Sequence, residues 1–378
     1  MKIVFDARWI REKSSGIGVY AREMMRRLPA LATDCEFVFL FQSHEAAAAE
    51  MREDIRALHN NTSSAVFPCG PMSLASQFKL PRLLDDMGTD VFLSPNYMIP
   101  YWWGGDGGKI IATIHDAIPL AVRGYAPKSL TSRFKLLYKH CLRKTVRRAT
   151  SVITVSESAK RDLTRILGLS ERLAAKIHVV YDGADCGSAH SAPVSFDSDD
   201  ARARKLLYVG RMDPYKNVPG LVRAFADAKK RVPFALRLVI AGSADPRYPE
   251  AREEAERLGV TDDVVFTGHI SDAELAALYR ESDLLTHFST YEGFGLPIVE
   301  AMRAGLPVVC TDGGSQPEVA GGAAEIVKAG DELSLAGAIA DILSSPVRML
   351  EMRKAGLVRA DEFTWAECAE KTMELIKS

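Results

Sequence analysis

Short runs of β-branched and aromatic residues alternate with longer helical patterns along the whole chain. Several of the short runs are apolar throughout, which is typical of parallel strands covered by helices on both faces. These runs predict strands at residues 3–6, 36–41, 65–67, 91–94, 110–115, 151–155 and 177–181 in the first half, and at 206–210, 236–242, 264–267, 284–288, 307–311 and 325–327 in the second. The alternation predicts an α/β fold with two doubly wound, Rossmann-like parallel-sheet domains.

A polar stretch separates the two halves. It runs from residue 186 to residue 203, is rich in small and acidic residues and has no helical or strand periodicity. We therefore expect a first domain over residues 1–186, a linker over 187–203 and a second domain over 204–363. Two such domains are expected to face each other across a cleft, with the ligand at the carboxyl ends of the strands.

Composition narrows the class of protein. The 378 residues include 48 Lys+Arg and 49 Asp+Glu, and 47 % are hydrophobic, as in ordinary globular proteins. The near-neutral balance argues against a general nucleic-acid binder, and no apolar stretch approaches the roughly 20 residues that cross a bilayer. Because the first residues read as a strand without a cleavage-site pattern, a secreted precursor is not expected. Six cysteines lie far apart with no C-x-x-C pair, which favours reduced thiols in a cytoplasmic protein.

Two local concentrations of charge have alternative readings. Asp197 and Asp199 form an Asp-x-Asp of the kind that binds metal in some transferases, but no strand precedes them, so a solvated acidic run is favoured and no metal site is expected. Residues 133–148 hold seven Lys or Arg and no acid, with Phe134 and Leu137 at helical spacing. This predicts an amphipathic helix with its apolar stripe in the core. The alternative is a patch that contacts anionic lipid headgroups at the inner membrane.

The strongest motif follows the predicted strand at 284–288. Gly293 and Gly295 lie between that strand and a new helix, and such a loop presents backbone N–H groups and a positive dipole end that suit a phosphate. Glu292 and Glu300 bracket the loop. A carboxylate accepts hydrogen bonds from vicinal hydroxyls, so this pair suits a sugar and a ribose on either side of a diphosphate.

A second motif follows the first strand of the second domain. Gly210 permits a tight turn, Arg211 and Lys216 place two cations at the strand end, and Asn217 comes next. Paired cations over a diphosphate stabilise the charge that develops as it leaves. Alone they would usually be surface charges; we give them weight because they are expected opposite the Glu292 loop in the same sheet.

The first domain contributes two further motifs. His115 and Asp116 end a buried strand, where a histidine can hydrogen-bond a sugar hydroxyl, carry a proton or be purely structural. Gly16 and Gly18 belong to a G-x-G-x-x-A match to the dinucleotide fingerprint, but the strand before them ends near Asp6, so the loop is longer than the fingerprint requires. Such a loop can instead close over a diphosphate bound elsewhere.

Together these motifs resemble the GT-B-fold retaining glycosyltransferases of family 4, over essentially the whole chain. The resemblance rests on Glu292 and Glu300 around Glu-Gly-Phe-Gly-Leu-Pro, on Gly210-Arg211 with Lys216-Asn217, on Asp6-Ala7-Arg8 with Gly16 to Tyr20, on His115-Asp116 with Pro119, and on Pro317 to Gly321. The chain looks most similar to bacterial mannosyl- or rhamnosyltransferases that build O-antigen. This implies transfer of a hexose from a nucleotide-sugar, GDP-mannose first and a UDP-sugar second, to a saccharide or lipid-linked saccharide acceptor, with no metal or other cofactor.

The resemblance also implies residue roles. Glu300 would hold the ribose and Glu292 the transferred sugar, and Arg211 and Lys216 would neutralise the diphosphate. The remaining donor contacts would come from Gly16, Gly18, His115, Asp116, Gly210, Asn217, His269, Ile270, Gly293, Phe294, Gly295 and Leu296. Arg211, Lys216, Glu292 and His115 would carry the catalytic step, a front-face displacement in which the leaving phosphate takes the acceptor proton. The final helix, about residues 364–378, would cross back onto the first domain.

One departure from the family pattern and three other functions remain. The chain reads His287-Phe288-Ser289-Thr290 where relatives commonly have Pro-Ser before Tyr-Glu, which affects the donor-sugar contacts. A sugar-nucleotide 2-epimerase would need groups placed to remove a sugar proton. An NAD-dependent oxidoreductase would use residues 16–21, and a non-catalytic sensor would bind the nucleotide-sugar without turnover. An assay that detects transfer of the sugar to an acceptor distinguishes a glycosyltransferase from these three alternatives.

Overall fold

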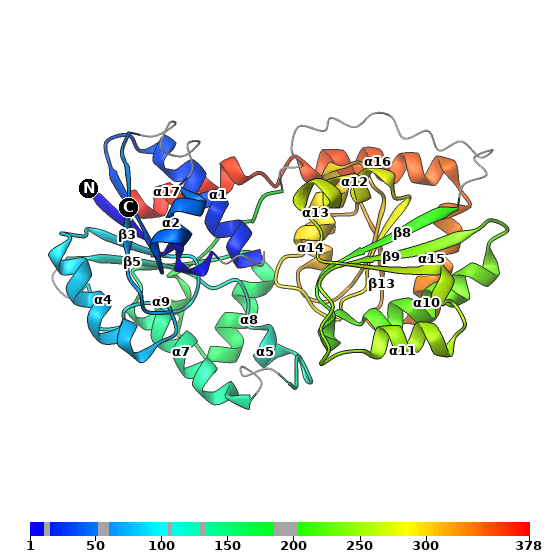
Figure 1. The fold of residues 1–378 in the computed structure, drawn as a ribbon, viewed down its shortest axis with the longest axis horizontal. Helices are drawn as coiled ribbons and strands as arrows, with labels where there is room; N and C mark the ends of the chain where they lie inside the picture. Colours follow the sequence, from blue (N-terminus) through cyan, green and yellow to red (C-terminus); the bar gives the residue numbers. More distant parts are fainter. Residues whose placement is uncertain (11–15, 52–59, 105–106, 129–132, 185–202) are drawn as a thin grey trace. The chain divides into compact units, whose positions relative to one another are not determined.

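The computed structural model describes residues 1–10, 16–51, 60–104, 107–128, 133–184 and 203–378. These residues form two compact units, each with its own sheet and helices (Figure 1). The first unit comprises Met1–Ala117, Phe134–Asp182 and Trp365–Ser378, and the second comprises Ile118–Arg133 and Gly183–Thr364.

The first unit contains a seven-stranded parallel sheet in the order β3-β2-β1-β4-β5-β6-β7. Its strands are β1 (Lys2–Phe5), β2 (Glu36–Phe41), β3 (Thr62–Val66), β4 (Val91–Ser94), β5 (Lys109–Thr113), β6 (Ser151–Thr154) and β7 (Ile177–Val179). Each corresponds to a predicted strand, but β3 begins earlier than expected. It lies at the sheet edge with Ser63 and Ser64 exposed, so it lacks the apolar run by which buried strands are recognised.

Helices connect these strands. They are η1 (Ala7–Trp9), α1 (Gly16–Leu31), α2 (His44–Glu50), α4 (Leu74–Asp86), α7 (Lys135–Arg148), α8 (Glu157–Leu167), α9 (Glu171–Ala174) and α17 (Trp365–Lys377). The C-terminal helix α17 packs beside α1 (Figure 1). There the rings of Trp365 and Tyr20 meet edge to face, with centroids 6.2 Å apart, and the Tyr20 hydroxyl lies 3.1 Å from Thr113 Oγ1 on β5. The last residues of the chain thus complete the first core.

The second unit contains a six-stranded parallel sheet in the order β10-β9-β8-β11-β12-β13. Its strands are β8 (Arg204–Val209), β9 (Leu236–Ala241), β10 (Val264–Gly268), β11 (Leu284–His287), β12 (Val308–Thr311) and β13 (Glu325–Val327). Its helices are α5 (Ile118–Ala121), η2 (Pro214–Lys216), α10 (Val218–Arg231), α11 (Glu250–Arg257), η3 (Thr261–Asp263), α12 (Asp272–Glu281), α13 (Leu296–Arg303), α14 (Gln316–Ala320), α15 (Glu332–Leu343) and α16 (Pro346–Ala360). Fully buried aliphatic and aromatic side chains from β8, β9, α10 and α15 form its core.

One segment lies in a different unit from the expected one. The predicted first domain, residues 1–186, includes residues that the structure groups with the second unit, Ile118–Arg133. Tyr125 stacks on Tyr215 with ring centroids 4.8 Å apart, and the backbone N–H of Lys128 donates to the Tyr248 hydroxyl. These aromatic contacts join residues far apart in sequence, which no local pattern encodes.

The basic helix also differs from its prediction. In α7 the buried residues are Leu142, Thr145 and Val146, whereas Phe134 and Leu137 are mostly exposed. The expected burial of those two side chains in the core is therefore wrong. Among the described residues, no single helix is long and apolar enough to span a membrane. One pair of helical segments, Glu332–Leu343 and Pro346–Lys377, has the required length and composition only when the two are taken together, and the pair is bent by 101°.

Candidate active site

The two strongest motifs meet in the second sheet. They follow β8 and β11, which are neighbours at the point where the strand order reverses. The loops leaving such a pair of strands diverge, and the gap between them is where open α/β sheets bind ligands. The expectation that the Lys216 loop lies against the Glu292 loop is confirmed by direct contact between these two side chains.

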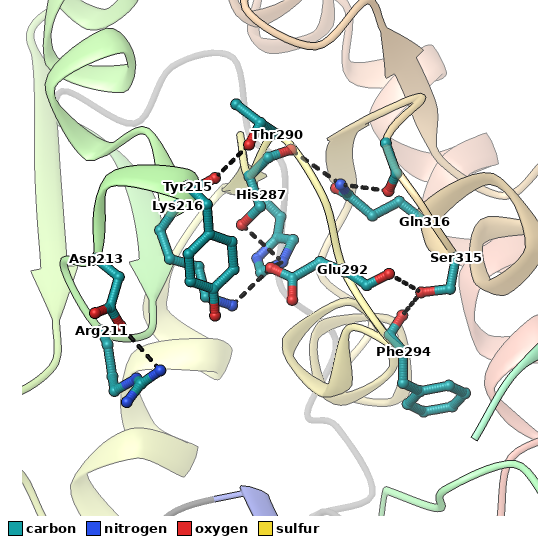
Figure 2. Close-up of polar contacts among 12 residues, drawn as sticks. Arg211, Asp213, Tyr215, Lys216, His287, Thr290, Glu292, Phe294, Ser315 and Gln316 are labelled. Atoms are coloured by element: carbon teal, nitrogen blue, oxygen red, sulfur yellow. Dashed lines mark hydrogen bonds and ion pairs between the residues drawn. The ribbon is translucent and has the colours of Figure 1, made fainter. Parts of the chain in front are cut away.

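Three nearly buried side chains form the centre of this site. Lys216 Nζ lies 2.6 Å from Glu292 Oε1, and His287 Nε2 lies 2.8 Å from the same oxygen (Figure 2). Burial alone would raise the pKa of Glu292, but the Lys216 charge and the His287 hydrogen bond outweigh it and hold that pKa well below its usual range. Burial likewise opposes the charge on Lys216, yet Glu292 raises the Lys216 pKa overall. The centre is therefore an ionised pair.

His287 was not among the predicted site residues. It ends β11, where it is completely buried, and its Nδ1 has no hydrogen-bond partner among the described residues. A proton on Nδ1 would be a buried unsatisfied donor, so we assign the proton to Nε2, which donates it to Glu292. The signal in the sequence was a histidine at the end of a strand that begins with two leucines.

The Glu292 loop is held by the loop after β12. Gln316 Nε2 donates to the carbonyl oxygens of Ser289 and Gly313, each at 3.0 Å, and Ser315 Oγ donates to the Phe294 carbonyl oxygen at 2.7 Å (Figure 2). Gln316 and Ser315 are completely buried. Sequence reasoning did not find this support, because the contacts to Ser289 and Phe294 join residues more than 20 positions apart.

The cation loop after β8 depends on close backbone approach. A Cβ on Gly242, at the end of β9, would lie 2.0 Å from the Gly210 carbonyl oxygen. Arg211 follows Gly210 in this loop. Its side chain is 68 % exposed, and its Nη2 lies 2.9 Å from Asp213 Oδ2. Asn217 has φ 52°, the one positive value at a non-glycine position in the described part of the chain, and it is the N-cap residue that precedes α10. The loop thus presents Arg211 to solvent and Lys216 to Glu292.

Glu300 lies on α13, one turn beyond Gly295, which has φ +103° and caps the helix. The Tyr279 hydroxyl on α12 donates to Glu300 Oε2 at 2.6 Å, a contact the sequence did not predict. Burial raises the pKa of Glu300, and the Tyr279 hydrogen bond opposes that rise. His269 is exposed and Ile270 partly buried, both directly after β10.

The first unit holds the other predicted residues. His115 follows β5, its Nε2 lies 3.0 Å from the Pro95 carbonyl oxygen, and its ring meets Tyr20 edge to face at 5.1 Å. The carbonyl oxygen of the next residue, Asp116, accepts from the Tyr138 hydroxyl. Gly16 and Gly18 form the first turn of α1.

Burial lowers the pKa of His115 to about 4, although the contact with the Pro95 carbonyl opposes this shift. The folded protein then binds fewer protons than the unfolded chain between about pH 6.5 and pH 4, so His115 costs stability as pH falls through that range, by at most about 3 kcal/mol. We expect the wild type to lose more stability on acidification than His115→Gln. Urea unfolding of both proteins at pH 7 and near pH 4 measures the difference; parallel profiles would contradict the assignment.

No group of three or more His, Cys, Asp or Glu side chains is placed to bind a metal ion among the described residues. Asp197 and Asp199, for which the sequence predicted no metal, lie outside them.

Two family models match the chain. The Glycosyltransferase Family 4 model matches residues 14–188, and the Glycosyl transferases group 1 model matches residues 197–358, so together they span most of the sequence. The chain belongs to the glycosyltransferases. The family expected from the Glu292, Gly210 and Gly16 motifs is thereby confirmed, and with it the assignment as a transferase.

Two relatives named as mannosyltransferases agree with this assignment. The glycosyltransferase is 27 % identical over 388 residues to the O-antigen chain mannosyltransferase B of Escherichia coli, a match that covers 100 % of both chains. It is 29 % identical to the MMP alpha-(1->4)-mannosyltransferase of Mycolicibacterium hassiacum, over 71 % of this chain and 64 % of the relative.

Among solved structures, it resembles sucrose-phosphate synthase from Thermosynechococcus elongatus, with a TM-score of 0.76, 19 % identity and coverage of 100 % and 98 % of the two chains. Anabaena HepE in complex with UDP-glucose gives a TM-score of 0.76 and 19 % identity, with coverage of 100 % and 99 %. Two parallel-sheet units and these neighbours confirm the GT-B fold class.

Proposed function

We propose that this glycosyltransferase transfers mannose from GDP-mannose, with retention of configuration, to a saccharide or lipid-linked saccharide acceptor of surface polysaccharide synthesis. The observation that carries the proposal is the Lys216–Glu292 pair at the strand-order reversal of the second sheet. The full-length relative named as an O-antigen chain mannosyltransferase supports the sugar and the acceptor class.

In the proposed reaction, the bond between the anomeric carbon and the diphosphate oxygen breaks while the acceptor oxygen bonds to that carbon on the same face. The acceptor proton passes to the leaving phosphate oxygen, so the step needs no side chain as general base. Arg211, which is exposed, and Lys216, which is nearly buried, offset the charge that develops on the diphosphate, and no metal or cofactor is required for that purpose.

The two carboxylates take different parts of the donor in this proposal. Lys216 and His287 fix Glu292 through its Oε1, so we assign its Oε2 to a hydroxyl of the transferred sugar. Glu300, oriented by Tyr279, accepts from the ribose hydroxyls. His115 donates its Nε2 proton to Pro95, which makes its Nδ1 an acceptor for a sugar hydroxyl. Gly16, Gly18, Asp116, Gly210, Asn217, His269, Ile270 and residues 293–296 supply the other donor contacts.

A UDP-sugar is the second candidate donor, because the structural neighbour HepE was solved with UDP-glucose. The base is recognised by the loop after β10, where His269 and Ile270 lie, and neither side chain by itself selects guanine over uracil.

Thermal shift and transfer assays test the proposal together. GDP, UDP, dTDP, ADP and NAD are compared by the rise in melting temperature, since a ligand of the folded state raises it by mass action. We expect GDP to give the largest rise in melting temperature. The Glu300→Gln variant should no longer show this GDP-induced rise. The Glu292→Gln variant should still show it but should not transfer mannose from GDP-mannose. An α-linked product confirms retention; a shift with NAD alone, or a β-linked product, would overturn the proposal.

We propose that the enzyme acts in the cytoplasm and that, to reach a lipid-linked acceptor, it contacts the cytoplasmic face of the inner membrane as a peripheral protein. The six Lys or Arg of α7, within the basic segment 133–148, are the groups we assign to that peripheral contact. The helix contains no acidic residue to oppose it.

A further inference from the structure

Four large apolar side chains are exposed together on the first unit. Met72, Leu74, Phe78 and Trp102 are 61 %, 80 %, 65 % and 60 % exposed. Leu74 and Phe78 are one turn apart on α4, and the Phe78 and Trp102 rings stack with centroids 5.3 Å apart. We call this group the Trp102 surface. Contiguous exposed apolar groups of this kind mark a binding surface, whereas single ones do not.

The Trp102 surface is held rigidly from beneath. Gln77 Nε2 on α4 donates to the Ile99 carbonyl oxygen, and Gln77 Oε1 accepts from the backbone N–H of Tyr101. On the far side of Trp102, the indole N–H of Trp103 donates to Asp85 at 2.8 Å. The backbone on both sides of Trp102 is thus tied to α4, so its exposure follows from a fixed conformation.

Arg8 anchors the start of the same surface. It forms a buried bidentate pair with Asp6 after β1, and its Nη1 donates to the Cys69 carbonyl oxygen and to Ser76 Oγ. These bonds fix the segment that carries Met72 and the first turn of α4. The Asp6-Ala7-Arg8 motif therefore has a structural consequence: it orders an exposed apolar loop.

Positive charge borders the apolar group. Lys144 Nζ on α7 lies 4.5 Å from the ring centroids of both Tyr101 and Trp102, and Lys79 and Arg82 are exposed on α4. On α4 these two cations are matched by exposed Asp85 and Asp86, so the excess of positive charge comes from α7, which has six Lys or Arg and no acid. A cation held against an indole is typical of groups at a headgroup boundary.

We propose that the Trp102 surface docks on a bilayer that contains anionic phospholipids. Leu74, Phe78 and Trp102 enter the boundary between headgroups and acyl chains, and Lys144 with the other α7 cations contacts lipid phosphates. The loops after β3 and β4 carry this surface, and His115 follows the neighbouring strand β5 at the same edge of the sheet. The inference extends the lipid-linked acceptor of the proposed function.

A second copy of the chain fits less well. Face-to-face pairing would bring two α7 helices, each with six Lys or Arg and no acid, close to one another. The like charges would oppose that association, whereas anionic headgroups neutralise them. A bilayer can also bury protruding apolar side chains without providing a groove of matching shape, which a second protein copy would need.

Vesicle co-sedimentation of the full chain tests the proposal. Phosphatidylcholine vesicles with and without phosphatidylglycerol are compared for the wild type, Leu74→Ser/Phe78→Ser/Trp102→Ser and Lys144→Gln. We expect binding only with phosphatidylglycerol, a loss of at least about tenfold in the triple variant, and a smaller loss for Lys144→Gln that high salt reproduces in the wild type. The matched control is Leu333→Ser/Val358→Ser, at positions 70 % and 71 % exposed in the second unit, which should bind as the wild type does.

The outcomes separate this inference from the proposed function. GDP-induced thermal shift should be unchanged in the triple variant, since its three substitutions are in the first unit and replace none of the residues assigned to the donor. A wild type that ignores anionic vesicles but keeps the GDP shift would overturn the docking surface alone. A wild-type dimer that becomes monomeric in the triple variant would also overturn it, in favour of self-association. Vesicle binding without any nucleotide shift would support the surface and count against the proposed function.

Discussion

Lys216→Met is expected to lower the free energy of unfolding by about 3–5 kcal/mol and to abolish transfer. Removing one partner of a buried ion pair leaves the other charge uncompensated, and Glu292 is buried beneath its loop. Without the ammonium, burial dominates and the Glu292 pKa should rise.

The pH dependence provides the sharper readout. In the wild type the Glu292 pKa is depressed, so its stabilising contribution is present above the unfolded-state pKa and is lost on acidification. In Lys216→Met the sign should invert, and stability should fall as pH rises through the raised pKa. Urea unfolding at a series of pH values, for the wild type and for Lys216→Met, measures the loss of stability and the inverted pH dependence. Adding Glu292→Gln to Lys216→Met should restore much of the stability but none of the activity.

Lys205→Met is the matched control for this prediction. Lys205 pairs with Glu281 at 3.1 Å in the same unit, but the two side chains are 34 % and 60 % exposed, against 13 % and 7 % for Lys216 and Glu292. Exposed pairs contribute no more than about 1 kcal/mol, so this variant should keep its stability and its activity. Equal stabilities for Lys216→Met and Lys205→Met would show that the buried pair does not organise the site.

Gly314→Ala is expected to reduce transfer by at least about 100-fold. A Cβ at Gly314 would lie 2.3 Å from the Glu292 carbonyl oxygen and 2.9 Å from its backbone nitrogen, so the Glu292 loop must move. A displacement of about 1 Å at a catalytic group is enough for a loss of this size. Steady-state kinetics with the nucleotide-sugar donor, together with urea unfolding, measure the effect.

Gly322→Ala separates that contact from backbone strain. Gly322 has φ +84° and Gly314 φ +69°, so alanine is strained at both by about 1–2 kcal/mol, but nothing lies within 4 Å of a Cβ at Gly322. This control should lose stability and keep activity. If both variants retained transfer, contact between the loop after β12 and Glu292 would be irrelevant to catalysis.

Local sequence was sufficient for most of the architecture. Apolar runs such as Phe37 to Phe41 predict buried parallel strands, because a strand covered on both faces has no polar positions. The start of the edge strand β3 was predicted too late, because its exposed serines interrupt the apolar run by which a buried strand is recognised. The motifs at Gly210–Asn217 and Glu292–Glu300 were recognised because turns and helix starts constrain residue types locally.

The sequence by itself determined two parallel sheets, the glycosyltransferase family, and the presence of Lys216, Glu292 and Glu300 at strand ends. Only the tertiary structure decided what each side chain contacts: His287 and Lys216 on one carboxylate oxygen, Tyr279 on Glu300, and Gln316 beneath the Glu292 loop. It also decided that Phe78 and Trp102 stack in solvent. The physical reason is that strand and helix patterns arise from neighbours a few residues apart. Hydrogen bonds and ion pairs instead join groups that the strand order brings together from distant positions.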